Sequence, residues 1–480
     1  MGQIENLISR NDKMSLFDLL ACTIHGLSPV SLRKMISDLR ACTETKIQQD
    51  IQKFGIFYED MHNSYKNQYQ LPHNLILKIT DIINDCFRQN DCLAIGHFIE
   101  LADRAIGDFG HAYPYLGLKE KAWDSIVHIP PLNGNYKKAQ LKIYPVVRPF
   151  WNMHKAEQQR ALNINSILTN CQVIFPDAEE LLTLDYFYLK SDLISRSIEL
   201  NNGISIALSP VCDYAKLSHY QYETECVNKL KVLGLQNAEY VYNRVIRIFN
   251  DAFQKGFQII AFPEVIGSRQ ILTGIQEIMK KSPDYRSLVF LPTFYEEGRN
   301  KEIVLGPNGR LIHEQHKITA FNAIQKGKTI QEDILPGDTI KILLVEGLGA
   351  VTTPICMDLL EREESKLLHE QITANTIICP SFSPGIQAFQ DALAKGQAPH
   401  TLELWLNTCS AHDTSLFAHD YGFENIGMVH LPETPTGQET HRFDCMRRCG
   451  GICSEKLCYF NISLQYIDNK FHINGIHEIA

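Results

Sequence analysis

The chain has 480 residues, of which 44% are hydrophobic and 21% are charged, with fourteen cysteines and a net charge of −9. This length predicts two domains, and the composition excludes wholesale disorder. The negative charge disfavours nucleic acid as a partner. No apolar run reaches the ~18 residues of a membrane span, which predicts a protein without a membrane partner. The scattered cysteines favour a reduced, cytoplasmic protein.

The first part of the chain is predicted to be mainly helical. Residues 71–87 carry apolar side chains at helical spacing, whereas the run IPPLNGNY at 129–136 gathers proline, asparagine and glycine and predicts a loop. We expect residues 1–190 to form a mainly helical domain of unknown role.

From about residue 190 the pattern changes to short apolar strands that alternate with helices. The runs 193–200 and 204–211 predict two strands, 237–256 predicts a helix that ends at Gly256, and 257–264 predicts a buried strand. Strand, helix and strand in this order are typical of a crossover in an α/β sheet.

The same alternation continues towards the C-terminus. We expect a helix over 269–281 and a strand over 287–295, followed by a hairpin over 301–317 that turns on PNG. Next we expect two strands within 338–356, a helix over 364–373 and a strand over 375–382. The run GLGAVT, within 338–356, is interpreted as a hairpin turn. Residues 191–480 are therefore predicted to form an α/β domain.

Three reactive side chains stand where apolar runs end. Glu264 ends IIAFPE, Lys317 ends RLIHEQHK and Cys356 ends AVTTPIC. Reactive groups in α/β sheets tend to lie just past the carboxyl ends of strands. A carboxylate can take the thiol proton, a lysine ammonium and the backbone N–H of Met357 can stabilise an oxyanion, and the protonated carboxyl can return its proton to a departing nitrogen.

The segments AFPE, HKITAFN and PICMD, in this order, resemble the nitrilase superfamily of carbon-nitrogen hydrolases over residues 200–465. The resemblance implies a Glu–Lys–Cys triad of Glu264, Lys317 and Cys356, and a four-layer αββα sandwich. It implies an amidase- or nitrilase-type enzyme with a cysteine nucleophile, which cleaves a small amide or nitrile through a thioester by hydrolysis or acyl transfer. It further implies a homo-oligomer and no cofactor or metal.

The resemblance also bears on two neighbouring positions. Many members of the family carry a second glutamate between the lysine and the cysteine, and Glu332 in TIQEDILPGD is the candidate here. The arginine that usually follows CMD is absent, and LLEREESK stands there instead. Asp358 itself is interpreted as a structural hydrogen-bonding residue.

Two alternatives to this interpretation stay open. In the first, the nitrilase-like part is a catalytically altered scaffold, and the helical first part docks a partner protein. In the second, the tail residues Cys445, Cys449, Cys453 and Cys458 bind a metal, although their spacing differs from that of common zinc sites. His313 and His316 are three residues apart in a predicted strand, so their side chains point to opposite faces of the sheet. They are therefore not expected to share a zinc ion.

Overall fold

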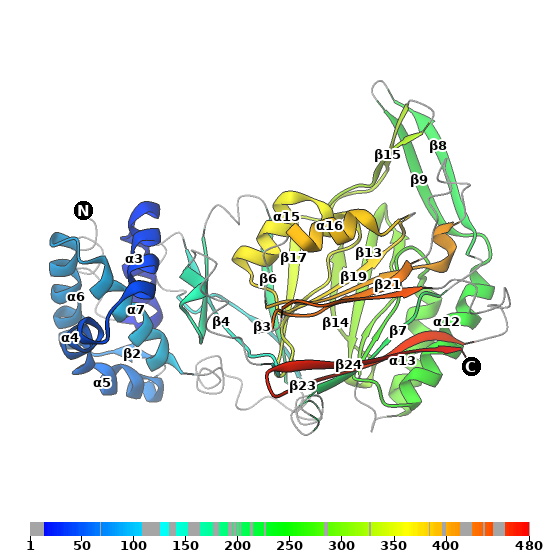
Figure 1. Cartoon of the computed structure of the whole chain (residues 1–480). Coiled ribbons are helices and arrows are strands. Elements are labelled where there is room, and N and C mark those ends of the chain that lie inside the picture. Colours follow the sequence, from blue (N-terminus) through cyan, green and yellow to red (C-terminus); the bar gives the residue numbers. More distant parts are fainter. Residues whose placement is uncertain are drawn as a thin grey trace.

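The chain folds as a mixture of helices and β-sheets (Figure 1). The computed structural model describes residues 14–479 apart from 68, 108–124, 134–140, 152–163, 176–181, 191–193, 195–197, 199–200, 202, 212–214, 225–226, 283–286, 326–327, 384, 396–399, 413–424, 435–436 and 445–456. Among these residues, no helix is long and apolar enough to cross a membrane.

Helices make up the blue end of the molecule in Figure 1. Their apolar faces enclose a cluster of buried residues that includes Phe17, Met35 and Phe98. The helix expected at 71–87 is confirmed. The helices are α2 (Leu16–His25), α3 (Pro29–Ala41), α4 (Glu44–Gly55), α5 (Tyr58–Asn63), α6 (His73–Arg88) and α7 (Cys92–Ile106), and β1 (Met14–Ser15) pairs with β2 (Gln70–Leu71).

Strands follow these helices where the sequence analysis expected mainly helical structure. Along TLDYFYLK, Leu184, Tyr186 and Tyr188 alternate with less buried residues, and this period of two suits a strand. The expectation of helices is therefore wrong for this segment. The strands are β3 (Ser125–Ile129), β4 (Lys142–Pro145), β5 (Cys171–Ile174) and β6 (Thr183–Lys190). Strands β3 and β6 precede residue 190, yet they join a sheet of the second part. The domain boundary at residue 190 stays a prediction.

Two eight-stranded sheets form the centre of the second part. The first has the order β12-β13-β11-β10-β7-β23-β24, with β14 paired to β13. Its strands are β7 (Gly203–Leu208), β10 (Ile259–Ala261), β11 (Leu288–Phe290), β12 (Phe294–Glu296), β13 (Arg299–Gly306), β14 (Arg310–His316), β23 (Cys458–Ile467) and β24 (Lys470–Ile479).

The second sheet has the order β22-β21-β20-β19-β18-β17-β6-β3. Residues of the two sheets share one buried apolar cluster, in which Ile206 and Leu208 of the first sheet join Leu343 and Leu404 of the second. The two sheets therefore pack face to face. The strands not yet given are β17 (Thr339–Val345), β18 (Gly349–Thr352), β19 (Thr376–Ser381), β20 (Leu402–Asn407), β21 (Asn425–His430) and β22 (Thr440–Asp444).

Helices cover the outer face of each sheet. Phe249 of α12 and Ile275 of α13 pack with Val289 against the first sheet, and Leu368 and Phe389 pack against the second. These helices are α12 (Ala238–Gln254), α13 (Arg269–Lys281), α14 (Met357–Leu360), α15 (Arg362–Lys366), the π-helical turn η5 (Leu367–Gln371) and α16 (Gln387–Lys395).

Several predicted elements are confirmed here. The helices α12 and α13 match their predicted runs, and Gly256, just past α12, has a φ of 79°. In the PNG turn, Asn308 and Gly309 have φ angles of 61° and 69°. The strand expected at 193–200 is wrong, because Ile194 and Ile198, the described residues of this run, are helical and pack into the cluster between the sheets.

A smaller sheet projects from the body beside the large ones (Figure 1). Its order is β15-β16-β9-β8. Strands β8 (Leu217–Glu223) and β9 (Asn228–Leu235) form an antiparallel hairpin, and β16 (Lys328–Glu332) runs parallel to β9 and antiparallel to β15 (Asn322–Gln325). This sheet brings residues before α12 next to residues that follow Lys317.

Candidate active site

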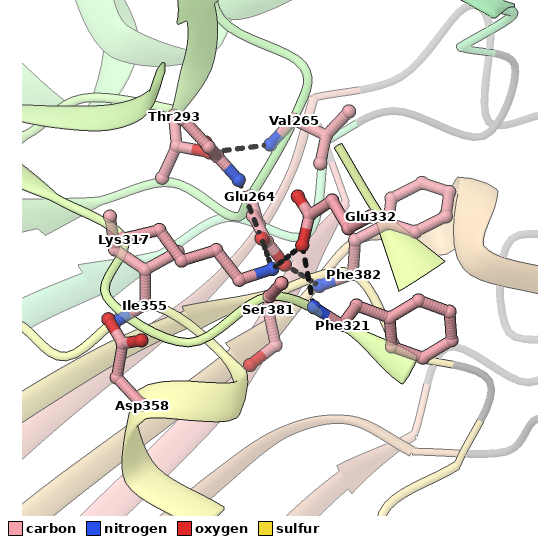
Figure 2. A network of polar contacts seen from close by, with 12 residues as sticks. Glu264, Val265, Thr293, Lys317, Phe321, Glu332, Ile355, Asp358, Ser381 and Phe382 are labelled. Carbon is pink, nitrogen blue, oxygen red and sulfur yellow. Dashed lines mark hydrogen bonds and ion pairs between the residues drawn. The ribbon is translucent and has the colours of Figure 1, made fainter. Parts of the chain in front are cut away.

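Glu264 lies just past the end of β10, and its side chain is almost fully buried. Its Oε1 accepts hydrogen bonds from Lys317 Nζ at 2.9 Å and Asn300 Nδ2 at 2.8 Å, and its Oε2 accepts one from the N–H of Phe382 at 2.8 Å (Figure 2). Burial raises the pKa of Glu264, and the charge of Lys317 opposes this shift. The carboxyl is therefore fixed in place by three donors.

The residue after this glutamate has a strained backbone. Val265 has a φ of 77°, which is unfavourable for a β-branched residue, and its N–H donates to Thr293 Oγ1 at 2.8 Å. Strain of this kind persists where surrounding contacts enforce it, and it is frequent at functional sites. The strained residue therefore lies directly beside Glu264 in the chain.

Lys317 follows β14 directly and lies between two carboxylates (Figure 2). Its Nζ is 2.9 Å from Glu264 Oε1 and 2.8 Å from Glu332 Oε2. Burial lowers the pKa of Lys317, but the charges of Glu264 and Glu332 outweigh burial and hold it well above the ordinary value. The side chain is thus a permanent buried cation.

Glu332, the candidate for the second glutamate, ends β16, and its carboxylate lies beside the ammonium of Lys317. Its Oε2 accepts the N–H of Phe321 at 2.8 Å, and its Oε1 accepts the hydroxyl of Tyr295. Burial raises the pKa of Glu332, but the charge of Lys317 and these hydrogen bonds outweigh burial and hold it below the ordinary value. Glu332 is therefore an anion at neutral pH.

Cys356 follows β18 and precedes α14 in an unusual conformation. Its φ is 50° and its ψ is −101°, and its N–H donates to the carbonyl of Pro380 at 3.0 Å. Burial and the nearby Glu264 raise the pKa of the thiol, while Lys317 and a backbone hydrogen bond from Phe382 lower it. The balance leaves a protonated thiol at neutral pH, which needs a base before it can attack.

The oxyanion-binding role expected for the backbone N–H of Met357 stays a prediction. Met357 is the first residue of α14, so its N–H has no acceptor within the helix. This N–H follows Cys356 directly and is the group that the sequence analysis assigned to oxyanion binding.

Asp358 joins the two segments that carry Lys317 and Cys356. Its Oδ1 accepts the N–H groups of Ile318 at 3.0 Å and Thr319 at 2.7 Å, and its Oδ2 accepts the N–H of Ile355 at 3.0 Å. Burial raises its pKa to about 7. In Figure 2 the carboxyl lies on the side of Lys317 away from Glu332, which agrees with the structural role expected for it.

One cavity of about 50 Å³ connects the predicted site residues. Glu264, Lys317, Cys356 and Glu332 all line it, so the structure brings together the four side chains that the sequence analysis singled out. The remaining lining residues are Leu217, Gln221, Leu230, Val232, Val265, Tyr295, Phe321, Ile330 and Phe382.

Three supporting contacts were missed by the sequence analysis. Asn300 lies inside β13, Tyr295 inside β12 and Phe382 just past β19, and each supplies a donor to one of the two carboxylates. No local signal marked Asn300, because it stands between Arg299 and Lys301 in the sequence and only the structure shows that its amide is buried and needs a polar partner.

The predicted cysteine cluster is not assembled within the described residues. Cys445, Cys449 and Cys453 lie outside the part of the chain that the structure describes, and Cys458 is a buried residue at the start of β23. In the described ranges, no group of three or more metal-binding side chains comes together.

Parts of the chain are similar to solved enzyme structures. Over 43% of its length it is similar to an amidase of the nitrilase superfamily from Nesterenkonia sp. AN1, with 12% identity, 76% of that chain covered and a TM-score of 0.31. Another structure of this amidase, a variant with the acetamide moiety of fluoroacetamide added covalently at its active-site cysteine, matches over 52% of this chain and 95% of its own, with 12% identity and a TM-score of 0.32.

A third similarity is to the glutamine-dependent NAD⁺ synthetase from Acinetobacter baumannii. It covers 57% of this chain and 45% of the synthetase, with 13% identity and a TM-score of 0.33. No family model matches the chain, and no curated protein matches it.

Proposed function

We propose that this protein is a carbon-nitrogen hydrolase that cleaves a small amide or nitrile through a thioester on Cys356. The observation that carries the proposal is the shared cavity, in which a strained, buried cysteine meets a lysine held between Glu264 and Glu332. Burial of each of these groups lowers the stability of the folded protein. A shared catalytic role explains why they are buried together.

The first half of the reaction forms the thioester. Glu264 takes the proton of Cys356, and the thiolate attacks the carbonyl carbon of the amide. The ammonium of Lys317 and the N–H of Met357 stabilise the oxyanion that forms. Glu264 then gives its proton to the departing nitrogen, so that ammonia leaves and the acyl group stays on the sulfur.

The second half releases the acid. Glu264 takes a proton from water as the water oxygen attacks the thioester carbonyl. The Cys356 thiolate then leaves and takes that proton from Glu264, which restores both groups for the next cycle. For an amide, each cycle consumes one water and releases one ammonia and one carboxylic acid. A nitrile needs a second water, because attack of the thiolate first gives a thioimidate that must be hydrolysed to the thioester. Glu332 positions Lys317 in both halves and has no proton to exchange.

A four-layer αββα sandwich is part of the same proposal. The face-to-face packing of the two large sheets, with α12 and α13 outside the first and α15, η5 and α16 outside the second, supports it. The cavity opens near the carboxyl ends of β10 and β19, where reactive groups are expected in such sheets.

Ammonia release from a panel of short amides tests the function directly. We expect turnover by the wild type, a loss of about a thousandfold or more in Cys356→Ala, and an acyl adduct on Cys356 by mass spectrometry. Cys171→Ala is the matched control, because Cys171 is also a buried thiol and belongs to the apolar cluster that includes Phe17 and Phe98. Full turnover by Cys356→Ala would overturn the mechanism. Added amine separates hydrolysis from acyl transfer.

A further inference from the structure

We propose that the projecting sheet β15-β16-β9-β8 forms a substrate-binding wall that selects amides with an uncharged, apolar acyl chain. This inference rests on the proposed function, because it names the substrate class of the same cavity. Of the residues in this sheet, the catalytic steps above use Glu332 alone, at the end of β16.

The wall is one face of that sheet. Leu217, Leu230, Val232 and Ile330 line the cavity from β8, β9 and β16, together with Gln221. Side chains alternate between the two faces of a strand, so Leu230 and Val232 face the cavity, whereas Leu233 faces away. Their exposure agrees, since Leu230 is 8% exposed and Leu233 is 58% exposed.

The wall is fixed relative to the catalytic groups. Glu332, which pairs with Lys317, ends the same strand β16 that supplies Ile330. Strand β16 pairs with β9 so that Glu332 lies beside Leu230, and the N–H of Asp333 donates to the carbonyl of Leu230 at 2.8 Å. The apolar wall and the partner of Lys317 therefore form one hydrogen-bonded unit.

The charges around the cavity disfavour an anionic substrate. Among the described residues that line it, Lys317 is the sole cation, and Glu264 and Glu332 already bind its ammonium at 2.9 and 2.8 Å. A substrate carboxylate would lose its hydration without gaining a cation, and it would face two carboxyl groups.

A positively charged acyl chain is disfavoured for a different reason. The wall would surround an ammonium with Leu217, Leu230, Val232 and Ile330, which offer no acceptor. Besides Glu332, which already binds Lys317, Gln221 is the sole polar side chain of this sheet that lines the cavity within the described ranges. Burying an unpaired charge costs far more than burying a methyl group. An apolar acyl chain can be buried against this surface without leaving a charge unpaired.

Alkylation of Cys356 tests the wall independently of turnover. Iodoacetamide and iodoacetate differ in charge but are similar in size. The ratio of their alkylation rates with glutathione gives the intrinsic preference of a thiol for the uncharged reagent. We expect the ratio of iodoacetamide to iodoacetate at Cys356 to exceed that of glutathione by about tenfold or more. A ratio equal to that of glutathione would overturn the proposal.

Two variants on one strand make the test specific. Leu230→Arg places a cation on the wall and should lower the ratio by about tenfold, whereas Leu233→Arg adds the same charge on the opposite face and should leave it within about twofold. Val232→Lys repeats the test if Leu230→Arg does not fold. Equal effects of Leu230→Arg and Leu233→Arg would contradict the proposal.

Turnover of matched amides separates this inference from the proposed function. We expect kcat/KM for pentanamide to exceed that for succinamate, a chain of similar length that ends in a carboxylate, by about tenfold or more. Hydrolysis of both amides at equal rates would overturn the wall and leave the function intact. Selective alkylation without turnover of any amide would overturn the function and support the wall.

Discussion

Lys317 and Glu332 form an ion pair that is almost completely shielded from solvent, with 2.8 Å between Nζ and Oε2. Each group has further partners, because Lys317 also contacts Glu264 and Glu332 also accepts hydrogen bonds from Tyr295 and Phe321. Breaking a buried pair leaves an uncompensated charge, so changes at this pair should cost much more than changes at the surface.

Glu332→Gln should lower the free energy of unfolding at pH 7 by roughly 2–4 kcal/mol, because it leaves Lys317 with one carboxylate. The folded protein holds the pKa of Glu332 below its ordinary value of 4.5. Its stabilisation is therefore complete above about pH 4.5 and is lost as the pH falls through the lower folded-state pKa. Urea unfolding of the variant and the wild type across this range measures the difference.

The neighbouring carboxylate provides the control for that experiment. Asp333 pairs with Lys231 at 3.5 Å, and both side chains are partly exposed. Asp333→Asn should therefore change the unfolding free energy by less than about 1 kcal/mol. An equal loss of unfolding free energy in Glu332→Gln and Asp333→Asn would show that the ion pair with Lys317 contributes no more to stability than a partly exposed pair.

Lys317→Met should reduce kcat for amide hydrolysis by about a hundredfold to a thousandfold, since it removes the cation proposed to stabilise the oxyanion. Ammonia release by the folded variant measures this loss. Lys301→Met is the matched control, because Lys301 is also a buried lysine and pairs with Glu296 at 2.6 Å outside the cavity. Comparable losses of kcat in the two variants would argue against a catalytic role for Lys317.

Asp358→Asn should slow the alkylation of Cys356 and lower the unfolding free energy by about 1–3 kcal/mol. The asparagine amide cannot accept the three backbone N–H groups that the carboxylate accepts from Ile318, Thr319 and Ile355. Iodoacetamide labelling and urea unfolding provide the two measurements. Glu361→Gln changes an exposed carboxylate nearby and should leave both unchanged. An unaltered labelling rate in Asp358→Asn would exclude a positioning role.

Glu403→Gln should change how stability depends on pH. Glu403 is buried on β20, 3.3 Å from His369 Nε2, and burial raises its pKa from 4.5 to about 8. The folded protein therefore holds a proton there that the unfolded chain loses, and this group makes the wild type less stable as the pH rises from about 4.5 to 8.

The glutamine variant has no such proton to lose. Its unfolding free energy, relative to that of the wild type, should increase by on the order of 1–3 kcal/mol between pH 5 and pH 8.5 in urea titrations. A constant difference across this range would mean that Glu403 keeps its ordinary pKa in the folded protein.

The sequence by itself determined the elements whose signal is local. The apolar spacing of α12 and α13 and the positive φ angles at the PNG turn follow from residues that are neighbours in the chain. The same holds for the ends of apolar runs, which is why Glu264 and Cys356 could be singled out before the structure was known.

Tertiary structure alone decided what surrounds those residues. Glu332 meets Lys317 because β16 pairs with β9, a strand about one hundred residues earlier, and the Phe382 N–H reaches Glu264 across more than one hundred residues. Strand β6 lies beside β17 although 156 residues separate Thr183 from its partner Thr339. Such contacts depend on strand pairing and on the packing of two sheets, and no period within a single segment encodes them.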